Sequence, residues 1–139
     1  MIRCVVAEDE HILRKGLILT TDWKSLGCEI IGEAENGEEA LNLIRRLHPD
    51  LIITDIRMPI LDGLSLIQEV QSFYNPEFII LSGYHDFSYA KTAIRLGVSD
   101  YICKPVDEDE LNQAIKNVVK KIQNKLEQTV LNPKIELVN

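Results

Sequence analysis

The chain has 139 residues, 45% of them hydrophobic, which suits one globular domain with one core. A formal net charge of −7 argues against nucleic-acid binding by the chain itself, because phosphate contacts need clustered lysine and arginine. No stretch approaches the roughly 20 apolar residues of a membrane span, and the short apolar start does not resemble a signal peptide. The cysteines Cys4, Cys28 and Cys103 lack metal-binding spacing, so we expect reduced thiols and a cytoplasmic location.

Short apolar segments alternate with longer amphipathic ones along the whole chain. The apolar segments predict strands at residues 2–7, 29–33, 51–54, 77–81 and 100–103. The second strand is more polar than the others, so we place it near an edge. Helices are expected from His11, after Asn36, after Asp62, from Phe87 and from Asp107. This alternation predicts a parallel sheet with helices on both faces.

Local signals set the expected ends of several helices. Asn36 resembles an N-cap with Glu39 three residues on, and Pro49 should stop that helix. Gly97 is expected to form a left-handed C-cap. The last helix has an apolar stripe from Leu111 to Ile122, acids in its first turn and lysines in later turns, and should end at Asn132.

Four of the predicted strands end in reactive polar groups. The first runs into Glu8, Asp9 and Glu10, and the third into Asp55. The fourth runs into Ser82, and the fifth into Lys104 followed by Pro105. Because ligands bind outside the carboxyl ends of strands in open parallel sheets, these groups should converge at one edge.

Crowded carboxylates at this edge predict a magnesium site. Glu8, Asp9 and Asp55 lie close together if the first and third strands are neighbours, and a divalent cation would offset their repulsion. The alternative is that the acids at 8–10 only cap the following helix. Asp55 favours the metal, since its place after a buried strand needs a separate reason.

The hydroxyl of Ser82 and the amine of Lys104 each have two interpretations. Lys104 either extends to solvent or pairs with Asp55 or a phosphoryl oxygen. Ser82 either satisfies a local backbone group or donates to a phosphoryl group. The sequence lacks a glycine-rich phosphate loop and a G-x-S-x-G elbow, so nucleotide binding by such a loop and hydrolase chemistry are disfavoured.

These residues resemble the receiver domain of bacterial two-component response regulators. The acid cluster, the segment Asp55 to Pro59 with Asp62-Gly63, Ser82, Tyr101 and Lys104-Pro105 follow the family order. The resemblance implies a flavodoxin-like, doubly wound α/β fold with a five-stranded parallel sheet and five helices. It covers residues 1–128, leaving 129–139 as a tail or the start of a linker to a missing output domain.

The resemblance also implies roles for single residues. Asp55 would accept a phosphoryl group from a sensor histidine kinase, with Mg²⁺ as cofactor. Glu8, Asp9, Asp55 and the backbone carbonyl of Arg57 would hold the metal. Lys104, preceding a cis proline, would contact the phosphoryl oxygens, and Ser82 and Tyr101 would form a switch pair. The domain would act only on itself, by phosphoryl transfer and autodephosphorylation, and not as an enzyme on outside substrates.

Some positions depart from the family pattern. Glu8 stands where aspartate is commoner, so its metal contact would be less direct, and Ser82 replaces the frequent threonine. Arg57 and Tyr84 add bulk beside the acceptor, which should affect access of attacking water.

A finer resemblance concerns the missing part of the protein. Segments 22–27 and 82–91 are similar to receivers of regulators with an AraC-type DNA-binding domain. DNA binding would then belong to that output domain, and there would be no membrane partner. Phosphorylation should promote a homodimer through the fourth helix, fifth strand and last helix.

The residues leave two other functions to consider. A magnesium-dependent phosphatase would need a second acid two residues after its nucleophile, where this chain has Arg57. A degenerate receiver that only binds proteins is disfavoured, because the key positions are all chemically competent.

Overall fold

The computed structural model describes residues 1–83 and 87–131 and contains a single parallel sheet of five strands. The strand order is β2-β1-β3-β4-β5, so β2 lies at an edge as predicted. The strand bounds are β1 (Ile2–Ala7), β2 (Cys28–Ala34), β3 (Leu51–Asp55), β4 (Glu77–Ser82) and β5 (Asp100–Cys103). Each predicted strand is therefore confirmed to within a residue or so at either end.

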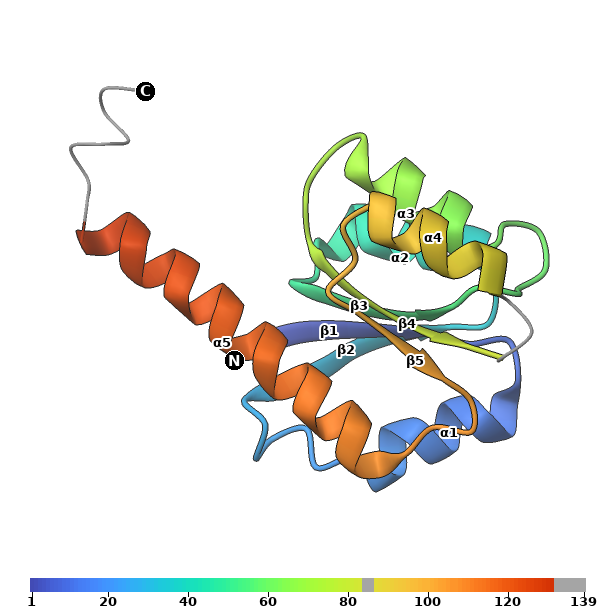
Figure 1. The fold of residues 1–139 in the computed structure, drawn as a ribbon, viewed down its shortest axis with the longest axis horizontal. Coiled ribbons are helices and arrows are strands. Elements are labelled where there is room, and N and C mark those ends of the chain that lie inside the picture. The colour runs from blue at the N-terminus through green and yellow to red at the C-terminus, as the bar shows by residue number, and fades with distance from the viewer. Residues whose placement is uncertain (84–86, 132–139) are drawn as a thin grey trace.

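Helices cover both faces of the sheet, which confirms the doubly wound fold class. In Figure 1, α1 (His11–Thr20) and α5 (Glu108–Leu131) lie on one face. The other face carries α2 (Gly37–Leu47), α3 (Gly63–Gln71) and α4 (Phe87–Arg95). The far half of α5 runs past the end of the sheet (Figure 1). The boundary at residue 128 stays a prediction, and residues 132–139 lie outside the described part of the chain.

The central strands are buried because both of their faces pack against helices. Val5 and Ile52 belong to the apolar layer under α2, α3 and α4, whereas their neighbours Val6 and Ile53 belong to the layer under α1 and α5. Successive strand residues point to opposite faces, so an unbroken apolar run supplies both layers. This is why the strands appear as continuous apolar segments in the sequence.

The predicted ends of α2 and the predicted C-cap after α4 are also confirmed, whereas the end expected for the last helix at Asn132 lies outside the described residues. The Asn36 side chain accepts a hydrogen bond of 2.8 Å from the Glu39 backbone N–H at the start of α2. That helix ends at Leu47, before Pro49. Gly97 follows α4 with φ of 77°, in the left-handed region that glycine tolerates best. Among the described residues, no helix is both long and apolar enough to cross a bilayer.

Two of the lysines in α5 form ion pairs with a glutamate of the sheet. Glu77, at the start of β4, is buried and accepts from Lys121 at 3.0 Å and from Lys125 at 3.3 Å. It also accepts from the Ser99 hydroxyl, just before β5. These contacts fix α5 against the end of the sheet that lies opposite the carboxyl ends of the strands.

Ile60, in the loop between β3 and α3, has a strained backbone. Its φ is 73°, which a β-branched residue rarely adopts, and its side chain is 74% exposed. Because asparagine tolerates this region, Ile60→Asn should raise the free energy of unfolding by about 1 kcal/mol. Urea denaturation checks this, with Ile94→Asn, an exposed site in α4, as a control. An equal change in both variants would contradict the strain argument.

Candidate metal centre

The topology brings the polar strand ends to one edge of the sheet. β1 pairs with β3, with Ala7 opposite Thr54, so Glu8, directly after β1, lies next to Asp55, the last residue of β3. This confirms the adjacency on which the expected acid cluster depended. On the other side of β3, Asp55 pairs with Leu81, and Ser82 of β4 pairs with Cys103 of β5.

Glu8, Asp9 and Asp55 form a group that could hold a cation. Each residue offers one carboxylate oxygen, and these oxygens lie within 4.8 Å of one another. Glu8 and Asp55 are buried, whereas Asp9 is exposed. A cluster of hard oxygen donors with an open side fits Mg²⁺, which keeps several waters and few carboxylates.

Lys104 links two members of this cluster. Its ammonium lies 2.6 Å from Glu8 Oε1 and 2.8 Å from Asp55 Oδ2. Burial alone would lower the pKa of Lys104, but the hydrogen bonds from Lys104 to Asp55 and Glu8 raise it instead. Lys104 therefore stays charged and offsets part of the repulsion between the two acids.

Glu8 is electrostatically the most perturbed member of the cluster. Its burial, reinforced by the nearby charge of Asp55, raises the pKa of Glu8 to about 7, although the Lys104 hydrogen bond opposes the shift. Only 3% of the residue is exposed to solvent. The ionised form of Glu8 is therefore unfavourable unless a cation lies nearby. A metal ligand is expected to behave in this way, because the cation stabilises its carboxylate.

Backbone groups fix the position of Asp55. Its Oδ1 accepts a hydrogen bond of 2.7 Å from the Ile56 N–H, while Oδ2 faces Lys104. The start of α3 packs against the same strand end, where a Cβ on Gly63 would lie 2.0 Å from the Asp55 carbonyl oxygen. Only glycine fits there, which explains the Asp62-Gly63 pair of the sequence motif.

The remaining predicted site residues lie in β4, in β5 and in the loops that follow β3 and β5. Ser82 is fully buried, and its hydroxyl donates to the Gly83 carbonyl at 3.1 Å. Tyr101 is half-buried in β5, and the peptide bond from Lys104 to Pro105 is cis, as expected. Arg57 is exposed in the loop after β3, and its role as a carbonyl ligand stays a prediction. Tyr84 lies outside the described residues.

Comparison with known proteins decides the family. Residues 4–116 match the model of the response regulator receiver domain. The chain belongs to this family. Acceptance of a phosphoryl group is general for receiver domains of two-component systems, as is Mg²⁺ binding at an acidic pocket. The resemblance inferred from the sequence motifs is confirmed.

Relatives of this receiver domain include transcriptional regulators. The chain is 37% identical over 124 residues to the transcriptional regulatory protein YesN of Bacillus subtilis, covering 88% of this chain and 34% of YesN. The receiver domain of AraT, a response regulator of Geobacillus stearothermophilus, superposes with a TM-score of 0.85. It is 39% identical, and the match covers 90% of this chain and 98% of that one.

A two-component transcriptional regulator AraC of Clostridium phytofermentans is similar in structure as well. Its TM-score is 0.82 at 32% identity, over 89% of this chain and 97% of that one. The receiver domain described here spans only about a third to a half of the length of the curated relatives it matches.

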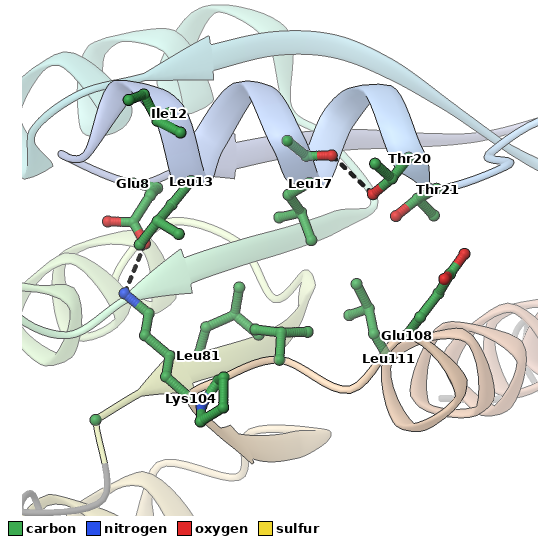
Figure 2. Close-up of a pocket in the computed structure, with 14 residues that line it drawn as sticks. Glu8, Ile12, Leu13, Leu17, Thr20, Thr21, Leu81, Lys104, Glu108 and Leu111 are labelled. Carbon is green, nitrogen blue, oxygen red and sulfur yellow. Dashed lines mark hydrogen bonds and ion pairs between the residues drawn. The ribbon is translucent and has the colours of Figure 1, made fainter.

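Sequence reasoning missed a groove that begins at the metal centre. The groove has a volume of about 630 Å³ and lies between α1 and the segment joining β5 to α5 (Figure 2). Glu8 and Lys104 line the end beside the acid cluster, and Ile12, Leu13 and Leu17 of α1 line one wall. Ile12 is 83% exposed on this wall, although the first helix packs against the sheet.

Proposed function

We propose that this receiver domain accepts a phosphoryl group on Asp55 from a sensor histidine kinase and thereby switches a DNA-binding output domain. The observation that carries the proposal is the environment of Asp55. A buried carboxylate faces a charged lysine at 2.8 Å and lies within 4.8 Å of two further acids. Such a site suits phosphoryl transfer, which depends on positioning and charge neutralisation.

The reaction needs one nucleophile and a way to offset charge. A carboxylate oxygen of Asp55 attacks the phosphorus of a phosphohistidine, the P–N bond breaks, and the imidazole leaves with the bonding electron pair and takes up a proton. The product is an acyl phosphate, whose lability suits a resettable signal. Lys104 then exchanges its contact with Asp55 for one with a phosphoryl oxygen, as a compact point charge.

Glu8 and Asp9, with Asp55, are the side chains that would hold Mg²⁺, together with the backbone carbonyl of Arg57. When bound, the cation neutralises charge on the transferring phosphoryl oxygens. Burial and the charge of Asp55 raise the pKa of Glu8 to about 7, and a bound cation would favour the ionised form of this carboxyl group.

The switch would run from the acceptor through β4 to β5. Ser82 is the residue of β4 that follows the partner of Asp55, and its carbonyl accepts from the Lys104 N–H at 2.6 Å. Phosphoryl oxygens would draw the Ser82 hydroxyl away from Gly83, and Tyr101 would follow into the released space. That movement would bias the surface formed by α4, β5 and α5.

The output is proposed from the relatives alone. YesN is a transcriptional regulatory protein about three times as long as the match, and the Clostridium phytofermentans protein is a transcriptional regulator named AraC. An AraC-type DNA-binding domain fits these names and the acidic charge of the receiver. A cytoplasmic location follows from the same proposal.

The direct test is phosphorylation by a small phosphodonor. With acetyl phosphate and Mg²⁺, the wild type should gain the mass of one phosphoryl group, and Asp55→Asn should gain none. Asp62→Asn, which alters another acid in the same loop, should still be phosphorylated. An adduct of equal size on Asp55→Asn, or no adduct on the wild type, would overturn the proposal.

The groove beside the site is the proposed docking surface for the kinase. It begins at Glu8 and Lys104, so a helix lying in it would bring a phosphohistidine within reach of Asp55. The test uses an autophosphorylated sensor kinase that phosphorylates the wild type. Ile12→Asp should lower the rate of phosphoryl transfer from this kinase by roughly tenfold. Transfer from acetyl phosphate should change less than about twofold, because Ile12 lies on the wall formed by α1 and is not one of the residues of the acid cluster.

Ile94→Asp is the matched control for this experiment. Ile94 is 73% exposed on α4, on the opposite face of the sheet from the groove. It should leave transfer from the kinase unchanged. Equal slowing by both substitutions, or slowing of both donors by Ile12→Asp, would contradict docking in the groove.

Dimerisation through α4, β5 and α5 remains part of the proposal. Ile94 of α4 offers an exposed apolar side chain on this surface. The basic face of α5 is less free than the sequence suggests, because Lys121 and Lys125 bind Glu77. Sedimentation of the phosphorylated and unphosphorylated protein tests the dimer, and equal masses would count against it.

A further inference from the structure

A buried arginine lies directly beside the acid cluster and has no part in the mechanism above. Arg14 of α1 is only 6% exposed, although arginine is rarely buried without partners. It lies on the same helix as the groove residues but points to the other side, toward the ends of β1 and β2. Its contacts explain why it is buried.

The guanidinium of Arg14 donates to three groups on three segments. Nη1 lies 2.7 Å from the backbone carbonyl oxygen of Glu8, and Nε lies 2.9 Å from Oε1 of Glu33 in β2. Nη2 lies 3.1 Å from the His11 ring at the start of α1. The planar, rigid fork of arginine suits such a set of fixed directions.

The contact with Glu8 bears on the metal centre. The carbonyl of Glu8 belongs to the peptide bond that joins Glu8 to Asp9, two of the three acids of the cluster. On the other side, the Glu8 N–H donates to the Ala34 carbonyl at 3.0 Å. Because both the backbone N–H and the backbone carbonyl of Glu8 are hydrogen-bonded, the directions of the Glu8 and Asp9 side chains are restricted before any ligand binds.

The charge of Arg14 is balanced locally. Glu33 accepts from Lys15 at 2.9 Å through its second oxygen, and hydrogen bonds from Lys15 and Arg14 hold the pKa of Glu33 below its usual range. Glu33 is therefore ionised and offsets the guanidinium. The Lys15 ammonium is half-exposed and therefore screened by solvent, so pairing of the buried Arg14 with Glu33 reduces its repulsion toward a cation at the acid cluster.

We propose that Arg14 is a positioning residue for the divalent cation, acting through the Glu8–Asp9 peptide, with Glu33 as its charge partner. This inference rests on the proposed magnesium site. It assigns part of the metal affinity to a residue that does not touch the metal. Loss of outer-shell partners of this kind typically weakens metal binding by about 10–100-fold.

The first test measures Mg²⁺ binding to the unphosphorylated protein by isothermal titration calorimetry. Arg14→Met should raise the dissociation constant about tenfold, and Arg14→Lys should raise it less, since lysine keeps the charge but not the fork. Glu33→Gln should weaken binding about two- to threefold by leaving the guanidinium charge unbalanced. Lys15→Met is the control and should bind Mg²⁺ as the wild type does, because Lys15 contacts Glu33 without reaching Glu8.

The second test separates positioning from a merely structural role. The rate of phosphorylation by acetyl phosphate is measured against Mg²⁺ concentration for the wild type and Arg14→Lys. A positioning role predicts a higher half-saturating Mg²⁺ concentration with the rate at saturation changed less than about twofold. A lower thermal midpoint with unchanged Mg²⁺ affinity in both Arg14 variants would overturn the inference.

Failure of the inference and failure of the proposed function give different results. If the wild type binds no Mg²⁺ and takes no phosphoryl group, the proposed function fails. If the wild type does both and the Arg14 variants bind Mg²⁺ equally well, only the positioning role fails. If Arg14→Met does not fold, the Mg²⁺ affinities of Arg14→Lys and Glu33→Gln are compared with that of the wild type instead.

Discussion

In the absence of a divalent cation, Glu8→Gln should make the protein more stable than the wild type at pH 8, by roughly 1–3 kcal/mol. Burial, with the charge of Asp55, raises the pKa of Glu8 from 4.5 to about 7, so the ionised side chain is unfavourable in the folded state. Glutamine has nearly the same shape, and its oxygen can still accept from Lys104. It removes the buried charge that the wild type must carry above pH 7.

The sign of the pH dependence follows from the raised pKa. Between about pH 4.5 and 7 the folded wild type keeps the Glu8 proton that the unfolded chain has lost. The contribution of Glu8 to stability is therefore fully present below pH 4.5 and is lost as the pH rises through 7. The stability advantage of Glu8→Gln should accordingly be small near pH 4.5 and reach its full size above pH 7.

Urea denaturation at several pH values, with EDTA present, measures this difference. Glu10→Gln is the matched control, since it removes the same charge from an exposed position of the same segment. Its effect should stay within about 0.5 kcal/mol at every pH. Excess Mg²⁺ should narrow the gap between Glu8→Gln and the wild type. A gap that did not change with pH would contradict this account of Glu8.

Most of the fold was predictable because buried parallel strands leave an unmistakable pattern. Runs such as Ile52-Ile53 supply apolar side chains to both helical layers, and the polar second strand correctly indicated an edge. Glu8, Asp9, Asp55 and Lys104 lie together for a related reason. Parallel strands end at the same edge, so a polar group after each apolar run is placed by topology alone.

The features that the sequence did not predict depend on tertiary contacts. Helix α1 has apolar residues around most of its circumference, so its composition cannot tell that Ile12 stays exposed and opens a groove. Arg14 stands among the apolar residues of α1 beside Lys15, and the sequence does not tell which of the two is buried, because the partners of Arg14 are Glu8, after β1, and Glu33, in β2. The left-handed backbone of Ile60 has no sequence signal, because β-branched residues disfavour it.

The second large effect is expected from Lys104→Met, which should lower the free energy of unfolding of the metal-free protein at pH 8 by about 2–4 kcal/mol. Lys104 lies 2.6 Å from Glu8 and 2.8 Å from Asp55, whose side chains are only 4% and 9% exposed. Without it, two buried carboxylates face each other with no cation between them. The loss should shrink near pH 5, where Glu8 holds its proton, and should shrink when Mg²⁺ is added.

A double-mutant cycle with Glu8→Gln shows whether this explanation holds. Adding Glu8→Gln to Lys104→Met removes one of the two unpaired charges, so the double variant should recover at least half of the lost stability. Lys116→Met, an exposed lysine of α5, should change stability by less than about 0.5 kcal/mol. Strict additivity of the two site substitutions would contradict direct coupling between Glu8 and Lys104.

The same Lys104→Met variant should take phosphoryl groups from acetyl phosphate roughly 100-fold more slowly, because the charge that faces the phosphoryl oxygens is gone.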